Sequence, residues 1–590
     1  MAAKAACVVL LLAGVACATP LDDYIYNSTD NSYNWTDTGL RVNASKQGWT
    51  GYILNMTSQT WLPEHLFEPW PLSPSRSVWW HLMVVIVPDK PLKFKDIVLM
   101  YMTGGDNKGT GSPGSDPSAV ASDEDVVLMA AVATRVGMVG AVLFQIPNQP
   151  CTFRADTTPW RKNRTEDALI AYTWNHFIDV NANTSLLPSP DGTANPEQEY
   201  VEAEWLLRFP MTKAGVRALD TLEQYVPKVN GDGGTPTRFI VAGASKRGWT
   251  TWTVGAVESA RKERSGKPNR VAAICPLVLD ILHFLPSIRT MYRKYGGWTF
   301  ALKDYYRMQI MGQIGNDATT LLAQLVDPYY YLPRYTMPKL LVMSGGDEFL
   351  MPDDTWFYYH KLPGEKHMLL LQNAEHSLAT GVLELIPAMQ AVALGIALEK
   401  PRPSMNWTKT WTGAQNQTAT LTAWSATKPQ RVLMHHAGTL PGQTTRDFRL
   451  FVGNSGIAET DTQRGVAKTD CEFKIGMDGG CLHPVLWFEK DLKPEAGSGP
   501  AKGYTYTHTM TGPPKYNAKG YNAFMMEFRF PGADMDPDAG KSCNLLSGDK
   551  CYHYSTEVVI VPNTYPYQNC CEASNPKCPS GMMCDDAPLM

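Results

Sequence analysis

The stretch VAGASKRGW, residues 241–249, constrains the fold more than any other part of this sequence. Ser245 follows an apolar run and precedes residues that favour a helix, which predicts a strand, a tight turn with the serine at its tip, and a helix. In a nucleophile elbow, small residues two positions before and after the serine let strand and helix pass closely. Gly243 meets the first requirement, whereas Arg247 occupies the second position and Gly248 comes one residue late.

The segments before this turn alternate between strand-like and helix-like patterns. Strand-like runs are predicted at residues 51–57, 77–88 and 96–103. A helix follows, with Ser122 as its N-cap, acids in its first turn and Gly137 at its end. A buried strand then starts at Met138. Because strand, helix and strand in turn are typical of a parallel sheet, the predicted fold class is α/β.

Two further strands place an acid and a histidine after the serine. The strand at residues 339–343 leads into Asp347, and the strand in HMLLLQNAEH leads into His376, before a helix that ends near Leu398. A serine hydroxyl needs a base to take its proton, and the base needs a carboxylate to fix its tautomer. The order Ser245, Asp347, His376 is that of α/β-hydrolases, so the sequence predicts these three as catalytic residues.

Other residues compete for two of these roles. The alternatives to His376 as the base are His283, His360 and His367, and the alternatives to Asp347 as the acid are Asp280, Asp353 and Asp354.

Oxyanion donors are predicted on both sides of the serine. One is the N–H of Lys246, and the other comes from the loop of Gly104 and Gly105, for which a plain turn is the alternative. Lys246 and Arg247 also place two cations beside the nucleophile. We expect a salt bridge there in preference to an anionic substrate group.

The motifs TGGDN, GASKRGWTTW, GGDEFLMPDD and NAEHSL resemble those of the PhoPQ-activated pathogenicity-related protein family, over roughly residues 50–570. The resemblance implies an α/β-hydrolase-like domain with a β-rich C-terminal extension. It leaves the activity open, because the family includes members regarded as secreted signals. The serine turn of the family departs from G-x-S-x-G in the same way as this one.

The domain organisation follows from composition and pattern. We expect a signal peptide at residues 1–18, an exposed and irregular glycosylated leader at 19–50, an α/β-hydrolase domain at 51–400, a β-sandwich-like domain at 401–567 and a Cys-rich tail at 568–590. Within the hydrolase domain, insertions at 151–200 and 285–331 interrupt the pattern, the second mostly helical. The first is either a lid or substrate pocket or a packed surface, and we expect the leaving-group pocket of a hydrolase to lie in these two insertions.

The first residues indicate export from the cell. Lys4 precedes a short apolar core, small residues stand where a signal peptide is cleaved, and no later run of about 18 uncharged apolar residues follows, so we expect a secreted protein without a membrane span. Eight asparagines lie in glycosylation sequons: Asn27, Asn34, Asn43, Asn55, Asn163, Asn183, Asn406 and Asn416.

Ten cysteines remain after removal of Cys7 and Cys17 with the signal, and most follow residue 470. In an oxidising compartment they predict disulfides, among them Cys543–Cys551 and Cys471–Cys481, and a covalently closed tail. Their spacing fits no zinc pattern, and we expect neither a metal nor a cofactor.

Composition limits the partners. A hydrophobic content of 44%, a charged content of 19% and a net charge of −4 describe a globular protein without the basic surface that nucleic acid requires. Two functions remain. One is a secreted serine hydrolase acting on an ester or peptide bond of a small-molecule or peptide substrate. The other is a secreted signalling or binding protein that uses the hydrolase fold as a scaffold and engages a cell-surface receptor.

Overall fold

The computed structural model describes residues 18–27, 29–69, 75–108, 120–187, 195, 198–230, 234–453, 473–474, 481–535, 543 and 551–567. The chain forms two compact units. Unit 1 comprises residues 1–277, 316–339 and 361–365, and unit 2 comprises residues 278–315, 340–360 and 366–590.

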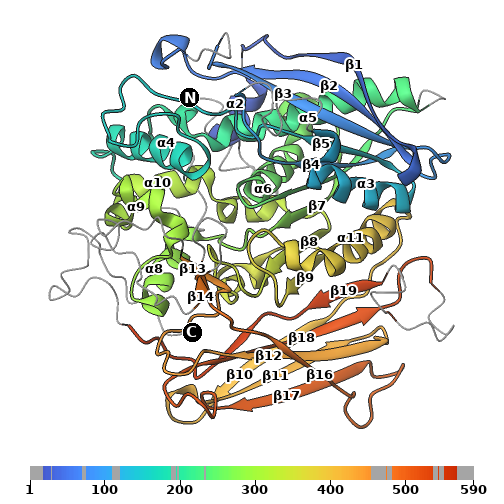
Figure 1. The fold of residues 1–590 in the computed structure, drawn as a ribbon, viewed down its shortest axis with the longest axis vertical. Coiled ribbons are helices and arrows are strands. Elements are labelled where there is room, and N and C mark those ends of the chain that lie inside the picture. The colour runs from blue at the N-terminus through green and yellow to red at the C-terminus, as the bar shows by residue number, and fades with distance from the viewer. Residues whose placement is uncertain are drawn as a thin grey trace. The chain divides into compact units, whose positions relative to one another are not determined.

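Seven strands form the sheet of unit 1 (Figure 1). Their order is β1 (Asn34–Ala44), β2 (Trp49–Thr60), β3 (Val78–Pro88), β5 (Val139–Leu143), β4 (Ile97–Met102), β6 (Arg238–Ala244) and β7 (Val271–Leu277). The pairs from β1 to β5 are antiparallel, and the pairs β5–β4, β4–β6 and β6–β7 are parallel. The parallel part is the sheet that the alternation of strand and helix predicts.

Helices cover both faces of this sheet. The helices of unit 1 are α2 (Pro20–Tyr26), α3 (Glu124–Val136), α4 (Glu166–Val180), α5 (Arg208–Val229), α6 (Lys246–Ser259), α7 (Arg261–Ser265) and α10 (Asp317–Val326). Leu99 pairs with Gly140, and a Cβ on Gly140 would lie 3.0 Å from Ala133 of α3. Met102 points to the opposite face, because it lies three residues after Leu99. There a Cβ on Gly215 of α5 would lie 2.9 Å from the Met102 sulfur.

Unit 2 contains the remaining strands of the α/β pattern. Its elements before residue 400 are α8 (Phe284–Tyr295), α9 (Lys303–Arg307), β8 (Lys339–Ser344, apart from its first residue), β9 (Lys366–Leu371) and α11 (Val382–Ala397). Residues 379–397 are long and apolar enough to cross a membrane by length and composition alone. These residues include α11, which packs against β19 (Tyr552–Ser555). The contact is close, because a Cβ on Gly395 of α11 would collide with the Tyr552 hydroxyl.

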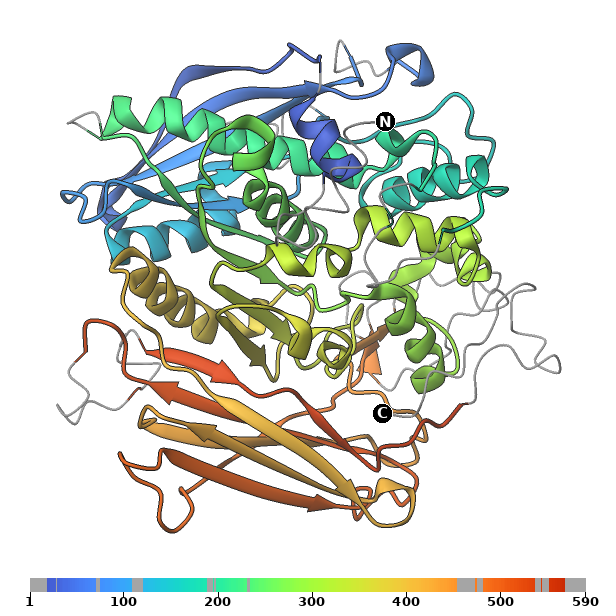
Figure 2. The ribbon, with the colours of Figure 1, turned by 180° about the vertical axis from the view of Figure 1, so that it is seen from behind.

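Antiparallel sheets make up the rest of unit 2. One contains β10 (Asn406–Thr412), β11 (Thr418–Ser425) and β17 (Tyr504–Thr511); a second contains β16 (Phe488–Asp491), β12 (Arg431–Gly438), β18 (Asn522–Phe530), β19 and β20 (Val559–Val561); a third contains β13 (Phe451–Gly453), β15 (Cys481–Leu482) and β14 (Phe473–Lys474). Tyr506 of β17 meets Phe528 of β18 edge to face, with ring centroids 5.4 Å apart. The first two sheets therefore pack face to face as a β-sandwich, drawn orange to red in Figure 2.

These observations establish the fold class. A mixed sheet with parallel inner strands, covered on both faces and carrying a serine turn between β6 and α6, is an α/β-hydrolase fold. A β-rich region follows it along the chain. The predicted boundary near residue 401 stays a prediction, and the compact units divide the chain differently.

The prediction of an irregular segment at residues 19–50 is wrong. Thr19 and Asp22 form a capping box at the start of α2, and Asp22 is buried in a bidentate ion pair with Arg334, at 2.9 and 2.8 Å. The strand β1 pairs with β2. The predicted cap of α3 is also wrong, because the side chain of Asp123, not Ser122, accepts the N-terminal hydrogen bond.

The disulfide Cys543–Cys551 is confirmed. Cys481 is disulfide-bonded, but its predicted partner Cys471 lies outside the described residues, as do the signal peptide and the Cys-rich tail. Cys151 and Cys275 are free and buried.

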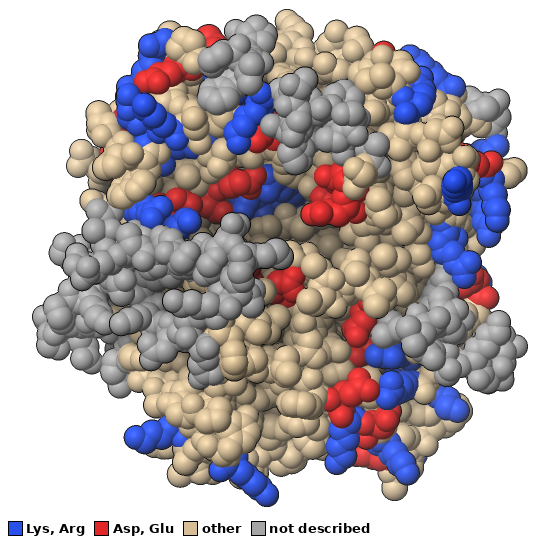
Figure 3. All heavy atoms as spheres, in the orientation of Figure 1, with Lys and Arg blue, Asp and Glu red and all other residues tan. Residues whose placement is uncertain are grey.

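Charges of both signs are interspersed on the face of the molecule in Figure 3, where uncharged residues are the majority. Among the exposed ion pairs of the described residues is that of Arg431 with Asp491, at 2.8 Å.

Candidate active site

Ser245 lies at the tip of a strained turn between β6 and α6. Its φ of 55° and ψ of −122° fall outside the regions that L-residues commonly adopt, at a cost of about 1–3 kcal/mol. Such strain occurs mostly at functional sites. A Cβ on Gly243 would lie 2.8 Å from the carbonyl oxygen of Arg247, so the position two before the serine must be glycine. The turn therefore has the geometry of a nucleophile elbow.

Arg247 does not obstruct the elbow, because its side chain turns into the protein. Arg247 is only 7% exposed. Its Nε donates to the Ile146 carbonyl, and its Nη1 and Nη2 donate to the two carboxylate oxygens of Glu166, at 2.7 and 2.6 Å. Lys246 binds the next acid, with its Nζ 2.8 Å from Asp167. The predicted salt bridge is present for both cations.

Glu166 is held ionised by these two cations. Burial raises the pKa of Glu166, but the Arg247 and Lys246 charges and the hydrogen bonds outweigh it and lower the pKa from 4.5 to about 2. Gln149 binds the same carboxylate, with its Nε2 2.7 Å from Oε1, and accepts from the Glu166 N–H at 2.7 Å.

The loop of Gly104 and Gly105 lies beside this network. Met102, the last residue of β4, pairs with Gly243 of β6, so the loop leaves the sheet next to the serine turn. The Gly104 carbonyl accepts from the Gln145 N–H at 2.6 Å, and the Gly105 carbonyl accepts from Gln149 Nε2 at 2.9 Å. The N–H groups of Gly104 and Gly105 donate to no other described residue. They are free to serve as oxyanion donors.

Asp347 and His376 form a hydrogen-bonded pair. Nδ1 of His376 lies 2.9 and 2.8 Å from the two carboxylate oxygens of Asp347. Asp347 also accepts from the N–H groups of Phe349 and Leu350 and from the Ser344 hydroxyl, at 2.8, 3.0 and 3.0 Å. The carboxylate is thus fixed, and it holds the His376 ring through Nδ1, the contact that a carboxylate makes to orient a catalytic histidine.

Further carboxyl groups surround this pair. Glu348 accepts from the backbone N–H of His376 at 3.0 Å, and burial, together with the charge of Asp347, raises the pKa of Glu348. Burial and the charges of Asp354 and Asp347 raise the pKa of Asp280 well above its usual range. Burial and the neighbouring carboxylates thus favour the neutral form of Glu348 and of Asp280.

The competing residues have other roles in unit 2. Asp353 pairs with Lys294 at 2.6 Å and with Arg446 at 2.5 Å, and these cations outweigh burial and lower its pKa to about 2. The ring of His367 stacks on Tyr554 with centroids 4.0 Å apart.

Of the remaining alternatives, His283 stands at the N-cap position of α8 without a side-chain capping bond, and His360 is exposed. Burial raises the pKa of Asp354 to about 7. Among the described residues, no group of three or more His, Cys, Asp or Glu side chains is arranged to hold a metal ion.

The predicted catalytic residues belong to two units. Ser245, Lys246, Gly104 and Gly105 lie in unit 1, and Asp347 and His376 lie in unit 2. The structure therefore gives the geometry of each half, and the catalytic roles stay predictions.

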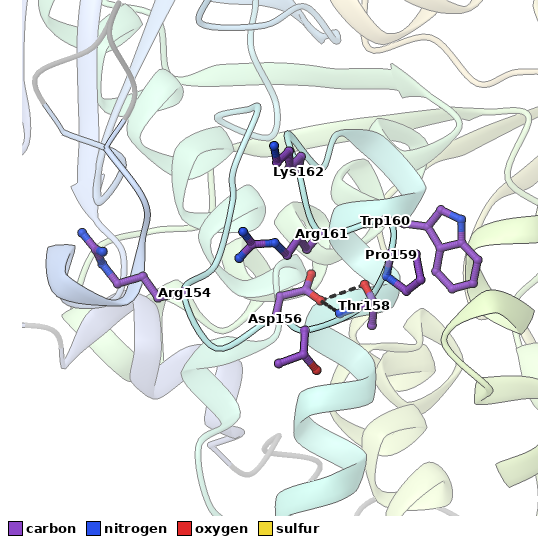
Figure 4. A pocket seen from close by; sticks show the side chains of 8 residues that line it. Arg154, Asp156, Thr158, Pro159, Trp160, Arg161 and Lys162 are labelled. Atoms are coloured by element: carbon purple, nitrogen blue, oxygen red, sulfur yellow. Dashed lines mark hydrogen bonds between the residues drawn. The ribbon is translucent and has the colours of Figure 1, made fainter.

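A pocket of about 470 Å³ opens in the first insertion (Figure 4). It is lined by Arg154 and by residues 156–162, which include the basic Arg161 and Lys162. Asp156 supports its wall by accepting from the N–H and hydroxyl of Thr158, at 2.9 and 2.8 Å, and by a buried ion pair with Arg164. A volume in this range suits a small ligand.

Three residues of this network were not predicted from the sequence: Glu166, Asp167 and Gln149. Glu166 and Asp167 lie 81 and 79 residues from their cationic partners, and only one pattern could have revealed them. Two acids in the first turn of a helix, within an otherwise basic insertion, match the two unexplained cations at the serine turn.

Three kinds of comparison relate the chain to known proteins. The family model described as PhoPQ-activated pathogenicity-related protein matches residues 21–449. Autocrine proliferation repressor protein A of Dictyostelium discoideum is 32% identical over 586 residues, which cover 98% of each chain. Acetyl xylan esterase 1 from Thermoanaerobacterium sp. is 12% identical with a TM-score of 0.38, over 64% of this chain and 90% of the esterase. A glucuronoyl esterase from Solibacter usitatus is 12% identical with a TM-score of 0.33, over 64% of this chain and 91% of the esterase.

Proposed function

The chain belongs to the PhoPQ-activated pathogenicity-related protein family, and we propose that it is a secreted serine hydrolase that cleaves an ester or peptide bond through an acyl-enzyme. The observation that carries this proposal is the strained Ser245 turn, because its φ of 55° and ψ of −122° lie outside even the left-handed region, and such a conformation persists only where the surrounding structure imposes it. The fixed Asp347–His376 pair supplies the base that such a serine needs.

The proposed reaction has two halves. Ser245 Oγ attacks the substrate carbonyl carbon while His376 Nε2 takes the serine proton, and Asp347 stabilises the imidazolium. The tetrahedral intermediate then collapses: the bond to the alcohol or amine breaks, and the leaving group takes the proton from His376. Water, deprotonated by His376, attacks the acyl-enzyme, and the acid departs as Ser245 recovers its proton.

The negative oxygen of each tetrahedral intermediate needs donors. We assign them to the N–H of Lys246 and to two N–H groups of the neighbouring loop. These are the N–H groups of Gly104 and Gly105, and they donate to no other described residue. Loss of one such donor raises the barrier by about 3–4 kcal/mol.

The first insertion supports a small or peptide substrate. Its pocket carries three basic side chains and the ring of Trp160, which suits a ligand with both an acidic group and an apolar face. Ester and peptide substrates are equally compatible with this lining.

Secretion is part of the proposal. It rests on the signal-like first residues and on the eight sequon asparagines, seven of which are exposed, while Asn416 is half-buried. Exposed positions are those where a glycan is accommodated without disturbing the core.

Labelling with a fluorophosphonate tests the catalytic proposal. The purified wild-type protein is expected to become labelled, and Ser245→Ala is expected to lose the label, since the probe bonds to an activated serine oxygen. His376→Ala retains the serine but removes its base and should label far more slowly. An unlabelled wild type, or a labelled Ser245→Ala, refutes the proposal. A panel of ester and peptide substrates then identifies the bond.

The second candidate is a secreted signalling or binding protein that uses the fold as a scaffold and acts through a cell-surface receptor. The observation that favours it is the relative named an autocrine proliferation repressor, which matches this chain over nearly its whole length. Cells of the producing organism, treated with purified wild-type protein or Ser245→Ala, separate the two candidates. Equal effects on proliferation support the scaffold, and an effect that requires Ser245 refutes it.

A further inference from the structure

Arg247 occupies the position where a nucleophile elbow usually has a small residue, and its side chain reaches the loop opposite the serine. A Cβ on Gly104 would lie 2.9 Å from Arg247 Nη2 and 3.2 Å from its Cζ, so the guanidinium lies directly against the Gly104 backbone. Any side chain at this position would displace the guanidinium. The departure from the usual elbow pattern therefore coincides with a specific contact to the second oxyanion segment.

A continuous set of hydrogen bonds links the same guanidinium to the far side of that loop. Arg247 binds both oxygens of Glu166, Glu166 Oε1 accepts from Gln149 Nε2 at 2.7 Å, and Gln149 Nε2 also donates to the Gly105 carbonyl at 2.9 Å. Gln149 is 4% exposed, so its amide has no water to replace these partners.

Arg247 also holds the residues that follow β5, Gln145 and Ile146, which bind the Gly104–Gly105 loop. The Arg247 Nε donates to the Ile146 carbonyl, while the Ile146 and Gln145 N–H groups donate to the carbonyls of Thr103 and Gly104, at 3.2 and 2.6 Å. The Asn107 N–H then donates to the Gln149 carbonyl at 2.6 Å. With their carbonyls fixed on one side, the N–H groups of Gly104 and Gly105 are held in one orientation.

We propose that Arg247 is a positioning residue, which holds the Gly104–Gly105 loop through Glu166, Gln149 and Ile146 so that its N–H groups remain aligned as oxyanion donors. This inference rests on the proposed function, since an oxyanion forms only if Ser245 attacks a carbonyl. It explains why the second small residue of the elbow is replaced: a glycine there would leave Glu166 and the loop without their common anchor.

The variants Arg247→Lys and Arg247→Ala test this role against a matched control. Arg334→Lys is the control, because Arg334 is also 7% exposed and also binds a carboxylate in a bidentate manner, at Asp22, far along the chain from the serine turn. Lysine retains the charge but cannot reproduce the paired bonds. Both lysine variants lose one bidentate ion pair and are expected to lower the thermal unfolding temperature similarly.

Two readouts separate positioning from folding. The rate constant for fluorophosphonate labelling, per folded molecule, is expected to fall about 10²-fold in Arg247→Lys and about 10³-fold in Arg247→Ala, and to stay within about twofold in Arg334→Lys, since the loss of an aligned oxyanion donor costs this much. Hydrogen exchange at the Asn107 amide is expected to quicken at least about tenfold in Arg247→Lys only, because the loop opens locally.

The outcomes are distinguishable. Wild-type protein that does not label refutes the proposed function, whatever the loop does. Labelling of wild type with an undiminished rate in Arg247→Lys overturns the positioning role, and so does unchanged exchange at Asn107. A fall in rate that the Arg334→Lys control shares equally also overturns it, because the effect then comes from general loss of stability.

Discussion

Replacing Glu166 by glutamine should destabilise the protein in a pH-dependent way. Glutamine has the shape of a protonated glutamic acid, so Glu166→Gln removes the negative charge and leaves Arg247 and Lys246 with a neutral partner. A carboxyl pKa lowered from 4.5 to about 2 corresponds to about 3.4 kcal/mol of stability at pH 7. Because the side chain of Glu166 is 32% exposed, solvent screening reduces the expected loss to about 2–3 kcal/mol.

The sign of the pH dependence follows from the direction of the pKa shift. The folded-state pKa of Glu166 is below its unfolded value, so the carboxylate contributes its full stability above about pH 4.5 and loses that contribution as the pH falls towards 2. The difference between wild type and Glu166→Gln should therefore be constant from pH 7 to pH 5. It should shrink to roughly 60% of that value at pH 3.5.

Urea unfolding followed by tryptophan fluorescence at several pH values measures this difference. Glu68→Gln is the control, because Glu68 makes only an exposed ion pair with Arg161 at 3.1 Å, and its loss should cost less than about 1 kcal/mol. Equal unfolding midpoints for wild type and Glu166→Gln at pH 7 would refute the reasoning. A difference that does not shrink below pH 4.5 would show that the charge of Glu166 is not its source.

Three further substitutions have defined outcomes. Gly243→Ala should lower the unfolding temperature, at a cost of about 1–3 kcal/mol, and should slow fluorophosphonate labelling, since its Cβ would lie 2.8 Å from a backbone oxygen; unchanged labelling would show that the elbow tolerates a methyl group. Asp347→Asn should reduce kcat by about 10⁴-fold with little change in KM, because an amide cannot fix the His376 tautomer as a carboxylate does; steady-state kinetics check this, and a fall confined to KM would contradict it. The double substitution of Cys543 and Cys551 by serine should lower stability by about 2–3 kcal/mol, measured by thermal unfolding, and should leave labelling of Ser245 unchanged; a lost label would contradict the separation of the two regions.

Local patterns predicted the scaffold of the serine turn well. The strands that end at Met102 and Ala244 and the helix that ends before Gly137 could be predicted, because continuous apolar runs and a C-cap glycine are local signals. The pairing of Asp347 with His376 was also within reach of local signals, since each residue lies in the loop after a predicted strand; the catalytic roles of Ser245, Asp347 and His376 stay predictions.

The predictions that were wrong or incomplete concern regions whose structure depends on contacts between residues distant in sequence. The segment at residues 19–50 is polar and reads as irregular, but Asp22 is ordered by Arg334, 312 residues away, and β1 by pairing with β2. The partner of Arg247 was missed for the same reason, since Glu166 lies 81 residues away and begins a helix in an insertion that carries no periodic signal. Local propensity is a weak guide where tertiary contacts supply the stability.

The strand β1 ends the described sheet of unit 1, which exposes it to a different hazard. A long, flat, open edge can accept a strand from another molecule and begin aggregation. Here the pairing register shifts between Asp37 and Arg41, Gly39 has a φ of 77°, and the two charged residues bind each other at 2.8 Å on the exposed surface. A bulge with fixed charges disrupts the straight ladder that an incoming strand would need, so this edge is protected against intermolecular strand addition.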